Sequence, residues 1–508
     1  MDKKKEVWQA LAGILCLIVG ALLAVYAGRG YTQHRYIVDA AACRMDLVVM
    51  NRADLLASPD TGSVVLFHGL SANKVIMEYL ARAFAQAGLR AFIPDLPGHG
   101  RSPGPFTPEQ AESCSASLLR GLAARGMIIP DRTILAGHSM GGAIALRLAD
   151  KFRPAGVIAL SPAPMAAAHG ISPENLLFHS PPLLTPNTLI MAAQFDAPGI
   201  RDSAADLAVH SPYSWAKFYE VPWNTHVSVL FSPTVARDAQ AWATHMLQIP
   251  NIALLPSRAN LFGCVLGIVG LLLIAGPFIR EMVGKNAPAA PEAHEAGELV
   301  QRARGFVELG LLSAVALVVL HYWHPVRIFR LFEGDYLAAF FLIVGVGLIL
   351  LHRKSASTGF RGQRGVLFGA AVAGLLMTLL INGWFELTMT GAWLNMPRWG
   401  RLPLFFLTAF LFLYGLELLV GPVVKAGMRY VSWFLLLVLA WLFLSAGVLY
   451  FHSGEILLVL LSPYFALLFL FSGLGIQLVR RESGSPPAAA LFGAILLAGF
   501  CLVIFPLS

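Results

Sequence analysis

Charged residues are scarce in this sequence of 508 residues, where Asp, Glu, Lys and Arg together make up only 13% of the chain. A typical soluble domain carries roughly twice that fraction, whereas hydrophobic residues here reach 57%. This composition excludes a chain that is soluble along its whole length. Cysteine is also rare, with five residues, which excludes a small scaffold held together mainly by disulfides.

The five cysteines show no spacing typical of a metal site or a thiol nucleophile. Three of them, Cys16, Cys264 and Cys501, fall in long hydrophobic runs. Only Cys43 and Cys114 lie in the more polar part of the chain, so at most one disulfide is available there. We interpret all five as small apolar residues, and the sequence implies neither a metal nor an organic cofactor.

Nine hydrophobic runs approach or exceed the roughly 18–20 residues that span a bilayer. They lie near 7–28, 259–279, 304–323, 335–352, 364–384, 402–424, 430–451, 455–478 and 486–506. The chain is therefore predicted to have three parts: an N-terminal transmembrane helix at 1–28, a polar domain at 29–255, and a membrane domain of about eight helices at 256–508.

Lys and Arg are distributed unevenly among the loops that connect these runs. Basic residues cluster in Lys3–Lys5 and then in alternate loops at 280–304, 353–364, 425–429 and 480–481. The intervening loops carry only Arg327, Arg330, Arg398 and Arg401. Because cytoplasmic loops are enriched in Lys and Arg, we predict a cytoplasmic N-terminus and an extracytoplasmic polar domain. The net charge of +8 follows from this bias and indicates no nucleic-acid partner.

The first hydrophobic run has two interpretations. Its length favours an uncleaved signal anchor, although Val25-Tyr26-Ala27 also fits a signal-peptidase site. The rest of the topology is the same in either case. Together with an Ala- and Gly-rich composition, the loop charges favour a multi-pass protein of a bacterial inner membrane.

Short apolar runs alternate with helical patterns between residues 29 and 255. The runs that read as strands are 63–67, 91–94, 132–136, 157–160, 188–194 and 217–221, and the stretches with helical spacing are 73–88, 107–126, 140–153 and 234–247. This alternation predicts a mostly parallel sheet with helices on both faces. In such sheets, functional residues collect at the carboxyl ends of the strands.

The segment Gly137-His138-Ser139-Met140-Gly141 ends one predicted strand and begins a predicted helix. In that context Gly-X-Ser-X-Gly is the form of a nucleophile elbow, a tight turn that exposes the serine hydroxyl. The flanking glycines remove Cβ atoms that would collide with neighbouring backbone. The N-terminus of the following helix favours the negative charge that develops during acyl transfer. Ser139 is therefore the predicted nucleophile.

A serine hydroxyl needs a histidine to take its proton and a carboxylate to orient that histidine. Asp196 follows the strand at 188–194 and opens a predicted loop, and His226 follows the strand at 217–221. Their order after Ser139 is the one expected for this kind of sheet. Asp202 and Glu220 are the alternative acids, and both are less well placed because one lies further along and the other lies inside a strand.

Two backbone N–H groups are needed to stabilise the oxyanion of a tetrahedral intermediate. We predict that Met140, directly after the nucleophile, supplies one and that Leu70, in the loop after the strand at 63–67, supplies the other. Gly69 permits that loop to approach the site closely. His68 is predicted to fix the loop by hydrogen bonding rather than to act as a base.

These motifs resemble those of the α/β-hydrolase superfamily, in particular its branch of monoacylglycerol lipases, lysophospholipases and related serine aminopeptidases. The resemblance is carried by Phe67-His68-Gly69, by Asp95 to Ser102, by Gly137 to Gly142 and by the positions of Asp196 and His226. It covers about residues 60–250 and none of the eight C-terminal runs, and it implies an α/β-hydrolase domain. Together with the hydrophobic runs and the short interval described below, the sequence predicts this domain with a short cap, fused to an all-α transmembrane bundle. The resemblance also implies that the loop Asp95–Ser102 is structural, so His99 has no predicted catalytic role.

Family members often carry a sizeable cap between two late strands, but here the interval Pro162–Asn187 has only about 26 residues. A short cap suits a bulky substrate or one presented by the membrane. The sequence thus favours a serine hydrolase, of the esterase, lipase or thioesterase type, that cleaves a lipid or acylated substrate at the extracytoplasmic face. An acyltransferase, a peptidase, or a transport or sensing protein with a ligand-binding hydrolase-like domain stays an alternative. The natural substrate and the oligomeric state stay open.

The predicted membrane domain carries few ionisable groups. We interpret Glu417 as a lone charge within a predicted membrane span, and intramembrane charges favour a functional role. Trp384, Trp393 and Trp399 flank the predicted outside loop 385–401 and read as interfacial anchors. We also hypothesise that this loop forms a lateral entrance for a lipid, because it is predicted to lie on the same side of the membrane as Ser139.

Overall fold

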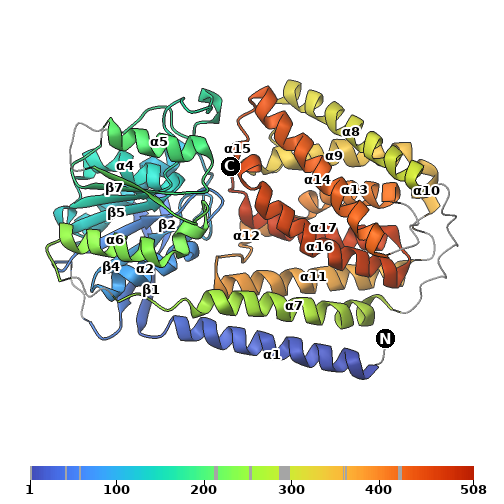
Figure 1. Ribbon diagram of the computed structural model, residues 1–508, viewed down its shortest axis with the longest axis horizontal. Helices are drawn as coiled ribbons and strands as arrows, with labels where there is room; N and C mark the ends of the chain where they lie inside the picture. Colours follow the sequence, from blue (N-terminus) through green and yellow to red (C-terminus); the bar gives the residue numbers. More distant parts are fainter. Residues whose placement is uncertain are drawn as a thin grey trace. The chain divides into compact units, whose positions relative to one another are not determined.

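The computed structural model describes residues 3–40, 43–55, 59–182, 184–210, 216–250, 254–284, 298–358, 360, 363–420 and 426–508. Residues 285–297 of the predicted cytoplasmic loop 280–304, and residue 425 of the loop 425–429, lie outside the described residues. The chain divides into two compact units, drawn in Figure 1. The helical unit comprises Met1–Val19, Val265–Trp384 and Ala392–Phe505, and the sheet unit comprises Gly20–Cys264, Phe385–Gly391 and Pro506–Ser508.

An eight-stranded sheet forms the centre of the sheet unit, with the order β1-β2-β4-β3-β5-β6-β7-β8. The strands are β1 (Tyr31–Ala40), β2 (Cys43–Arg52), β3 (Ser63–Phe67), β4 (Arg90–Pro94), β5 (Thr133–His138), β6 (Gly156–Leu160), β7 (Thr188–Ala193) and β8 (Lys217–Val221). From β4 through β3 to β8 all pairs are parallel, whereas β1 pairs with β2 and β2 with β4 in antiparallel fashion. The predicted α/β-hydrolase architecture with a mostly parallel sheet is confirmed.

Helices cover both faces of this sheet (Figure 1). On one face α2 (Glu78–Gln86) packs against α6 (Pro233–Met246), and on the other α3 (Pro108–Ala124) packs against α4 (Met140–Phe152). A further helix, α5 (Pro198–Val209), contacts β7 and β8. The stretch after Asp196, predicted as a loop, is therefore a helix that begins almost at once, with Pro198 in the first turn where a proline fits well.

Strands β1 and β2 are the main elements that the sequence pattern did not predict. Most of the six predicted strands contain a continuous apolar run, as buried parallel strands require. The exception is 217–221, which includes Lys217 and Glu220. In contrast β1 lies at the sheet edge, is largely exposed, and carries polar residues such as Gln33, His34 and Arg35. An edge strand with this composition lacks the hydrophobic signal on which the prediction relied.

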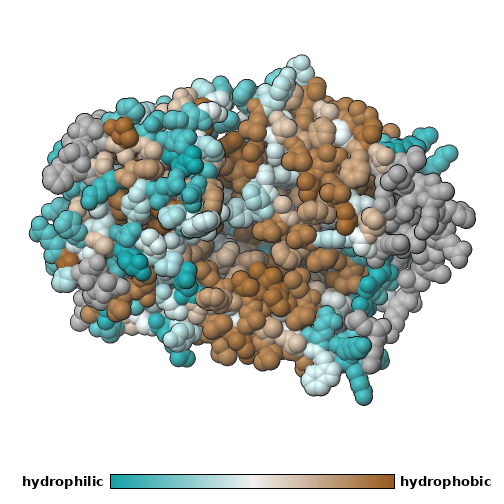
Figure 2. Space-filling model, viewed as in Figure 1, coloured by the Kyte–Doolittle hydropathy of each residue, from teal (hydrophilic) through white to brown (hydrophobic). Residues whose placement is uncertain are grey.

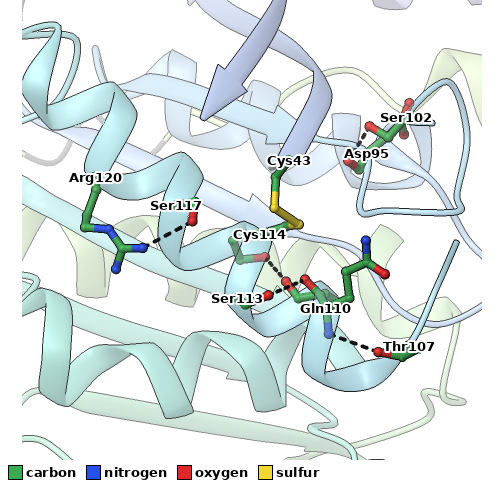
Figure 3. The surroundings of a disulfide bond; sticks show 11 residues. Cys43, Asp95, Ser102, Thr107, Gln110, Ser113, Cys114, Ser117 and Arg120 are labelled. Atoms are coloured by element: carbon green, nitrogen blue, oxygen red, sulfur yellow. Dashed lines mark hydrogen bonds between the residues drawn. A yellow bond between two sulfur atoms is a disulfide. The ribbon is translucent and has the colours of Figure 1, made fainter. Parts of the chain in front are cut away.

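A disulfide joins Cys43, at the start of β2, to Cys114 in α3, with a Cα–Cα distance of 5.4 Å (Figure 3). The interpretation of all five cysteines as small apolar residues is therefore wrong for these two. The bond fastens β2, the strand next to the edge strand β1, to a helix that is also anchored by its N-cap, where the Thr107 hydroxyl accepts a hydrogen bond from Gln110 N.

Loss of this disulfide is expected to destabilise the sheet unit by about 2–4 kcal/mol, because a cross-link over a long loop restricts the unfolded chain. The two cysteines are 71 residues apart in sequence. Thermal unfolding of the purified protein, with and without reductant, measures the effect. The Cys43→Ser/Cys114→Ser double variant is the control, since reductant should leave its unfolding temperature unchanged. An equal unfolding temperature for reduced and oxidised wild type would contradict the prediction.

Within the described residues, nine helices are long and apolar enough to cross a membrane, which agrees with the nine predicted runs. They are α1 (Lys3–Ala27), α7 (Ala259–Val283), α8 (Glu298–Trp323), α9 (Gly334–Leu351), α11 (Arg364–Thr388), α13 (Leu402–Val420), α14 (Ala426–Phe451), α16 (Ser462–Ser483) and α17 (Pro486–Ile504). The run predicted at 455–478 is divided, since α15 (Ile456–Leu460) ends before α16 begins. Figure 2 shows the apolar surface that these helices present.

The interpretation of Glu417 as a lone charge is wrong. Glu417 is buried in the last turn of α13, where it accepts hydrogen bonds from Arg429 at 2.6 Å and from Gln477 at 3.0 Å. Arg480 lies 3.5 Å away. A carboxylate that is compensated in this way by partners from other helices stabilises helix packing, and it gives no indication of a transport pathway.

Trp384 also differs from its predicted role as an interfacial anchor. It is only 7% exposed, and its ring fills a notch left by Gly267 of α7, where an added Cβ would lie 1.8 Å from Trp384 Cε2. By contrast, Trp393 is half-exposed. Trp384 is therefore a packing residue between two helices of the helical unit.

Candidate active site

Ser139 occupies the sharp turn between the end of β5 and the start of α4. Its backbone has φ 53° and ψ −119°, a conformation that is strained for any residue with a Cβ. Ser139 N donates to Leu160 O at 2.9 Å, and Ser139 O accepts from Ala143 N at 3.0 Å. The turn is thus held between the neighbouring strand β6 and its own helix, and the serine side chain is partly exposed.

The two glycines of the elbow are required by close backbone contacts. A Cβ on Gly137 would lie 2.1 Å from Gly141 O, and a Cβ on Gly141 would lie 2.1 Å from Phe67 O. Neither contact is sterically possible, and in both cases the obstructing atom is backbone. This explains why the Gly-X-Ser-X-Gly pattern is a structural requirement of the turn.

Asp196 and His226, predicted as a pair, are brought together by loops that follow adjacent strands. Asp196 follows β7 and His226 follows β8, and Asp196 Oδ1 lies 2.6 Å from His226 Nδ1. The Asp196 side chain is fully buried, while that of His226 is 24% exposed. This arrangement leaves His226 Nε2 free of the carboxylate, which is what a histidine acting on a serine requires.

The second carboxylate oxygen of Asp196 is also fully engaged. Its Oδ2 accepts hydrogen bonds from Ser161 Oγ at 2.5 Å and from Ala193 N at 3.1 Å. Burial alone raises the pKa of this carboxyl, but the hydrogen bonds from His226 and Ser161, together with the charge of His226, outweigh burial and lower it below the usual value. Asp196 is therefore an anion at neutral pH, as its predicted role beside His226 requires.

Ser161 and His138 are two residues of the site that the sequence analysis missed. His138 Nε2 contacts His226 O at 2.7 Å, and the two rings lie 4.7 Å apart. Burial lowers the pKa of His138 to about 3, so the ring is neutral and its Nε2–H donates to that carbonyl. His138 thus supports the loop of His226. Neither residue has a sequence signal of its own, because each takes its role only from a partner that follows a neighbouring strand.

The predicted oxyanion loop lies directly against Ser139, the predicted nucleophile. A Cβ on Gly69 would be 3.1 Å from both Ser139 Cβ and His138 Nδ1, so the backbone of this loop passes beside Ser139. Met140 is the first residue of α4, where N–H groups have no partner within the helix. The loop of Leu70 thus passes beside Ser139, and Met140 follows Ser139 directly in the chain. The roles of their N–H groups as oxyanion donors stay predictions.

His68 is held at both ring nitrogens within the buried interior. Its Nε2 accepts from Leu96 N at 2.9 Å, and its Nδ1 lies 2.8 Å from Gly69 O. Burial lowers the pKa of His68, so the ring stays neutral and Nδ1–H donates to the carbonyl. His68 joins the oxyanion loop to the loop that contains His99, which packs against it at 5.1 Å between ring centroids.

A buried ionic network contains Lys74, which follows the first of these loops, and Asp95, which begins the second. Lys74 forms ion pairs with Asp46 at 2.6 Å and with Asp95, and its backbone N donates to Asp95 Oδ1 at 2.8 Å. Asp46 also pairs with Arg35. Burial raises the pKa of Asp46, and the hydrogen bonds from Arg35 and Lys74 more than reverse this, so its pKa is lowered. Removal of Lys74 would leave two buried carboxylates without their shared cation.

The alternative acids do not reach His226. Arg201 of α5 pairs with Asp202 at 3.0 Å and with Glu220 at 3.8 Å. Two further histidines near the end of the sheet unit also lie elsewhere, since His210 caps the end of α5 and His245 lies in α6. In the part of the chain that the structure describes, no group of three or more His, Cys, Asp or Glu side chains is placed to hold a metal ion.

Residues 64–309 match the family model described as "Alpha/beta hydrolase family". Esterase YjfP of Escherichia coli (strain K12) is 30% identical over 96 residues, which cover 16% of this chain and 37% of the esterase. The sn-1-specific diacylglycerol lipase ABHD11 of Mus musculus is 35% identical over 88 residues, which cover 17% of this chain and 27% of the lipase. The chain thus matches well under two thirds of the length of either curated relative.

Among solved structures, the chain is similar to XC6422 from Xanthomonas campestris, described as a member of the α/β serine hydrolases without a lid. The TM-score is 0.34 and the identity 19%, over 43% of this chain and 95% of that one. The family match covers both the elbow and the residues at the ends of β7 and β8, and at the level of the family it supports a hydrolase.

Proposed function

We propose that this protein is a membrane-embedded serine hydrolase that cleaves an ester or thioester through an acyl-enzyme on Ser139. The observation that carries the proposal is the 2.6 Å contact between Asp196 Oδ1 and His226 Nδ1, in the fold that also holds Ser139 in a strained elbow. Strain of this kind persists where the surrounding structure imposes it, and it is concentrated at functional sites.

The proposed reaction uses the site residues in successive steps. Ser139 Oγ attacks the carbonyl carbon while its proton passes to His226 Nε2, and Asp196 stabilises the imidazolium that forms. The N–H groups of Met140 and Leu70 hold the developing oxyanion. The intermediate collapses as His226 protonates the departing alcohol or thiol, and water activated by the neutral His226 then releases the acid. An acyltransferase or peptidase would share the acyl-enzyme and differ in the acceptor or the leaving group.

Two exposed aromatic residues next to the site support an apolar acyl group as substrate. Phe195 and Trp223 are 56% and 84% exposed, and their rings lie 6.1 Å apart. Phe195 precedes Asp196, and Trp223 lies three residues before His226. Exposed apolar clusters of this kind mark ligand or membrane contacts. The names of the two curated relatives, an esterase and a diacylglycerol lipase, agree with such a substrate.

An extracytoplasmic location for the site is supported by three features. The Cys43–Cys114 disulfide favours an oxidising compartment. The loop charges favour an N-terminus inside and a polar domain outside. The segments Phe385–Gly391 and Pro506–Ser508, which follow spans predicted to end outside, both belong to the sheet unit.

Labelling with a fluorophosphonate probe tests the proposal. The detergent-purified, full-length protein is expected to react at a single serine, and mass spectrometry of the labelled peptide should identify Ser139. Loss of labelling after heat denaturation is the control for specific reactivity. A folded wild-type protein that does not react would contradict a hydrolase and favour a ligand-binding role in transport or sensing.

A further inference from the structure

The turn that carries the proposed oxyanion donor Leu70 is a short, self-contained feature of the sheet unit. Ala72 N donates to Gly69 O at 3.3 Å, which closes a turn with Leu70 and Ser71 at its centre. Ser71 adopts a left-handed conformation with φ 60°, which is unfavourable for a residue other than glycine. Such a turn keeps its geometry only if both of its ends are fixed.

One end of the turn is fixed by Gly69, which lies against Ser139, and the other end continues directly into Asn73. Asn73 is 8% exposed, and its side chain makes three hydrogen bonds. Its Oδ1 accepts from Val75 N at 3.1 Å, which caps the short helix η1 (Lys74–Met77). Oδ1 also accepts from Gly391 N at 3.1 Å, and Nδ2 donates to Gly391 O.

The backbone N–H and C=O of Gly391 therefore both form hydrogen bonds with the side-chain amide of Asn73. A Cβ on Gly391 would lie 2.4 Å from Asn73 Nδ2, so only glycine permits this paired contact. Gly391 belongs to the sheet unit as part of Phe385–Gly391. That segment is itself ordered, since Met389 N and Thr390 N both donate to Phe385 O and Asn260 Nδ2 donates to Thr388 O.

We infer that Asn73 is a positioning residue for catalysis, which fixes the turn of Leu70 by pairing with Gly391. Gly391 lies three residues beyond the end of α11, a helix long and apolar enough to span the membrane. The C-terminal half of the chain thus supplies part of the support of the active site. For Phe385–Gly391 we thus infer a role in holding the oxyanion loop, and the hypothesis of a lateral entrance at loop 385–401 stays untested.

This inference rests on the proposed function, and kinetics of the full-length protein with p-nitrophenyl butyrate test it. Loss of an oxyanion donor costs about 10²–10³-fold in kcat, and misplacement by about 1 Å costs up to about 10²-fold. Asn73→Ala is therefore expected to lower kcat about 10- to 100-fold and to leave KM within about two-fold. Gly391→Ala is expected to have a similar effect, because its Cβ displaces the Asn73 amide.

The double variant separates this mechanism from a general loss of stability. If Asn73 acts through Gly391, the combined substitutions lower kcat no further than either one alone. Asn73→Asp keeps the acceptor for Val75 N and removes the donor to Gly391 O, so it should fold normally and show an intermediate kcat. Thr107→Ala is the matched control, since it removes an N-cap of the same kind from α3 and should leave kcat unchanged.

Two results would overturn the inference while the proposed function stands. They are a fluorophosphonate-reactive Gly391→Ala variant with wild-type kcat, and fully additive losses in the double variant. A wild-type protein that does not react with the fluorophosphonate would overturn both, because there would be no oxyanion to position.

Discussion

Ser139→Ala is expected to abolish fluorophosphonate labelling and to lower kcat for p-nitrophenyl butyrate by about 10⁶-fold, the scale seen when a serine nucleophile is removed. The substitution deletes only Oγ, and no hydrogen bond of the described structure that fixes the elbow uses that atom. The backbone bonds from Ser139 N to Leu160 O and from Ala143 N to Ser139 O stay in place. The disulfide and the Asp196–His226 contact should likewise be retained, so the loss of turnover would report on chemistry rather than folding.

Ser139→Gly is the informative companion to that variant. Glycine adopts φ 53° and ψ −119° without the steric cost that a Cβ imposes, and that cost is of order 1–3 kcal/mol. We therefore expect Ser139→Gly to be inactive but more stable than Ser139→Ala by about 1–2 kcal/mol, measured by thermal unfolding. Equal stability of the two variants would contradict strain at the elbow, and an active Ser139→Ala would contradict the nucleophile itself.

Much of the fold could be predicted because the responsible signals are local. A buried parallel strand needs a continuous apolar run, and the six stretches predicted as strands correspond to β3 through β8, although β8 also carries Lys217 and Glu220. Membrane spans need long apolar stretches, and all nine candidates were recognised. The elbow also has a local signal, because close backbone contacts within the turn and with the adjacent strand require the glycines on either side of Ser139.

The features that were missed depend on residues far apart in the chain. Cys43 and Cys114 pair only because β2 and α3 meet, and Glu417 is compensated by arginines from α14 and α16. Ser161 reaches Asp196 across neighbouring strand ends. Asn73 and Gly391 are separated by 318 positions, and each by itself is an ordinary turn residue. A single sequence contains no periodicity or spacing that links such pairs.

Asp196→Asn is expected to lower kcat by about 10⁴-fold near neutral pH, and the surroundings of Asp196 explain why. Ser161 Oγ and Ala193 N both donate to Oδ2, so an asparagine here must direct its amide oxygen toward them. Its NH₂ group then faces His226 Nδ1. That nitrogen has to accept, which moves the ring proton to Nε2, the atom that should take the proton of Ser139. The variant would therefore hold His226 in place but in the wrong tautomer.

The chain contains a matched control for this substitution. Asp206 Oδ2 lies 2.6 Å from His169 Nε2, the same separation as in the proposed catalytic pair, but both side chains are partly exposed. Asp206→Asn should leave kcat and KM unchanged, since this pair lies at the surface. If Asp196→Asn retained more than about a tenth of wild-type turnover, compared with the 10⁴-fold loss expected of a misoriented histidine, Asp196 would not be the orienting acid. Since Asp202 and Glu220 are paired with Arg201, that result would instead favour a histidine held chiefly by the contact between its own carbonyl and His138.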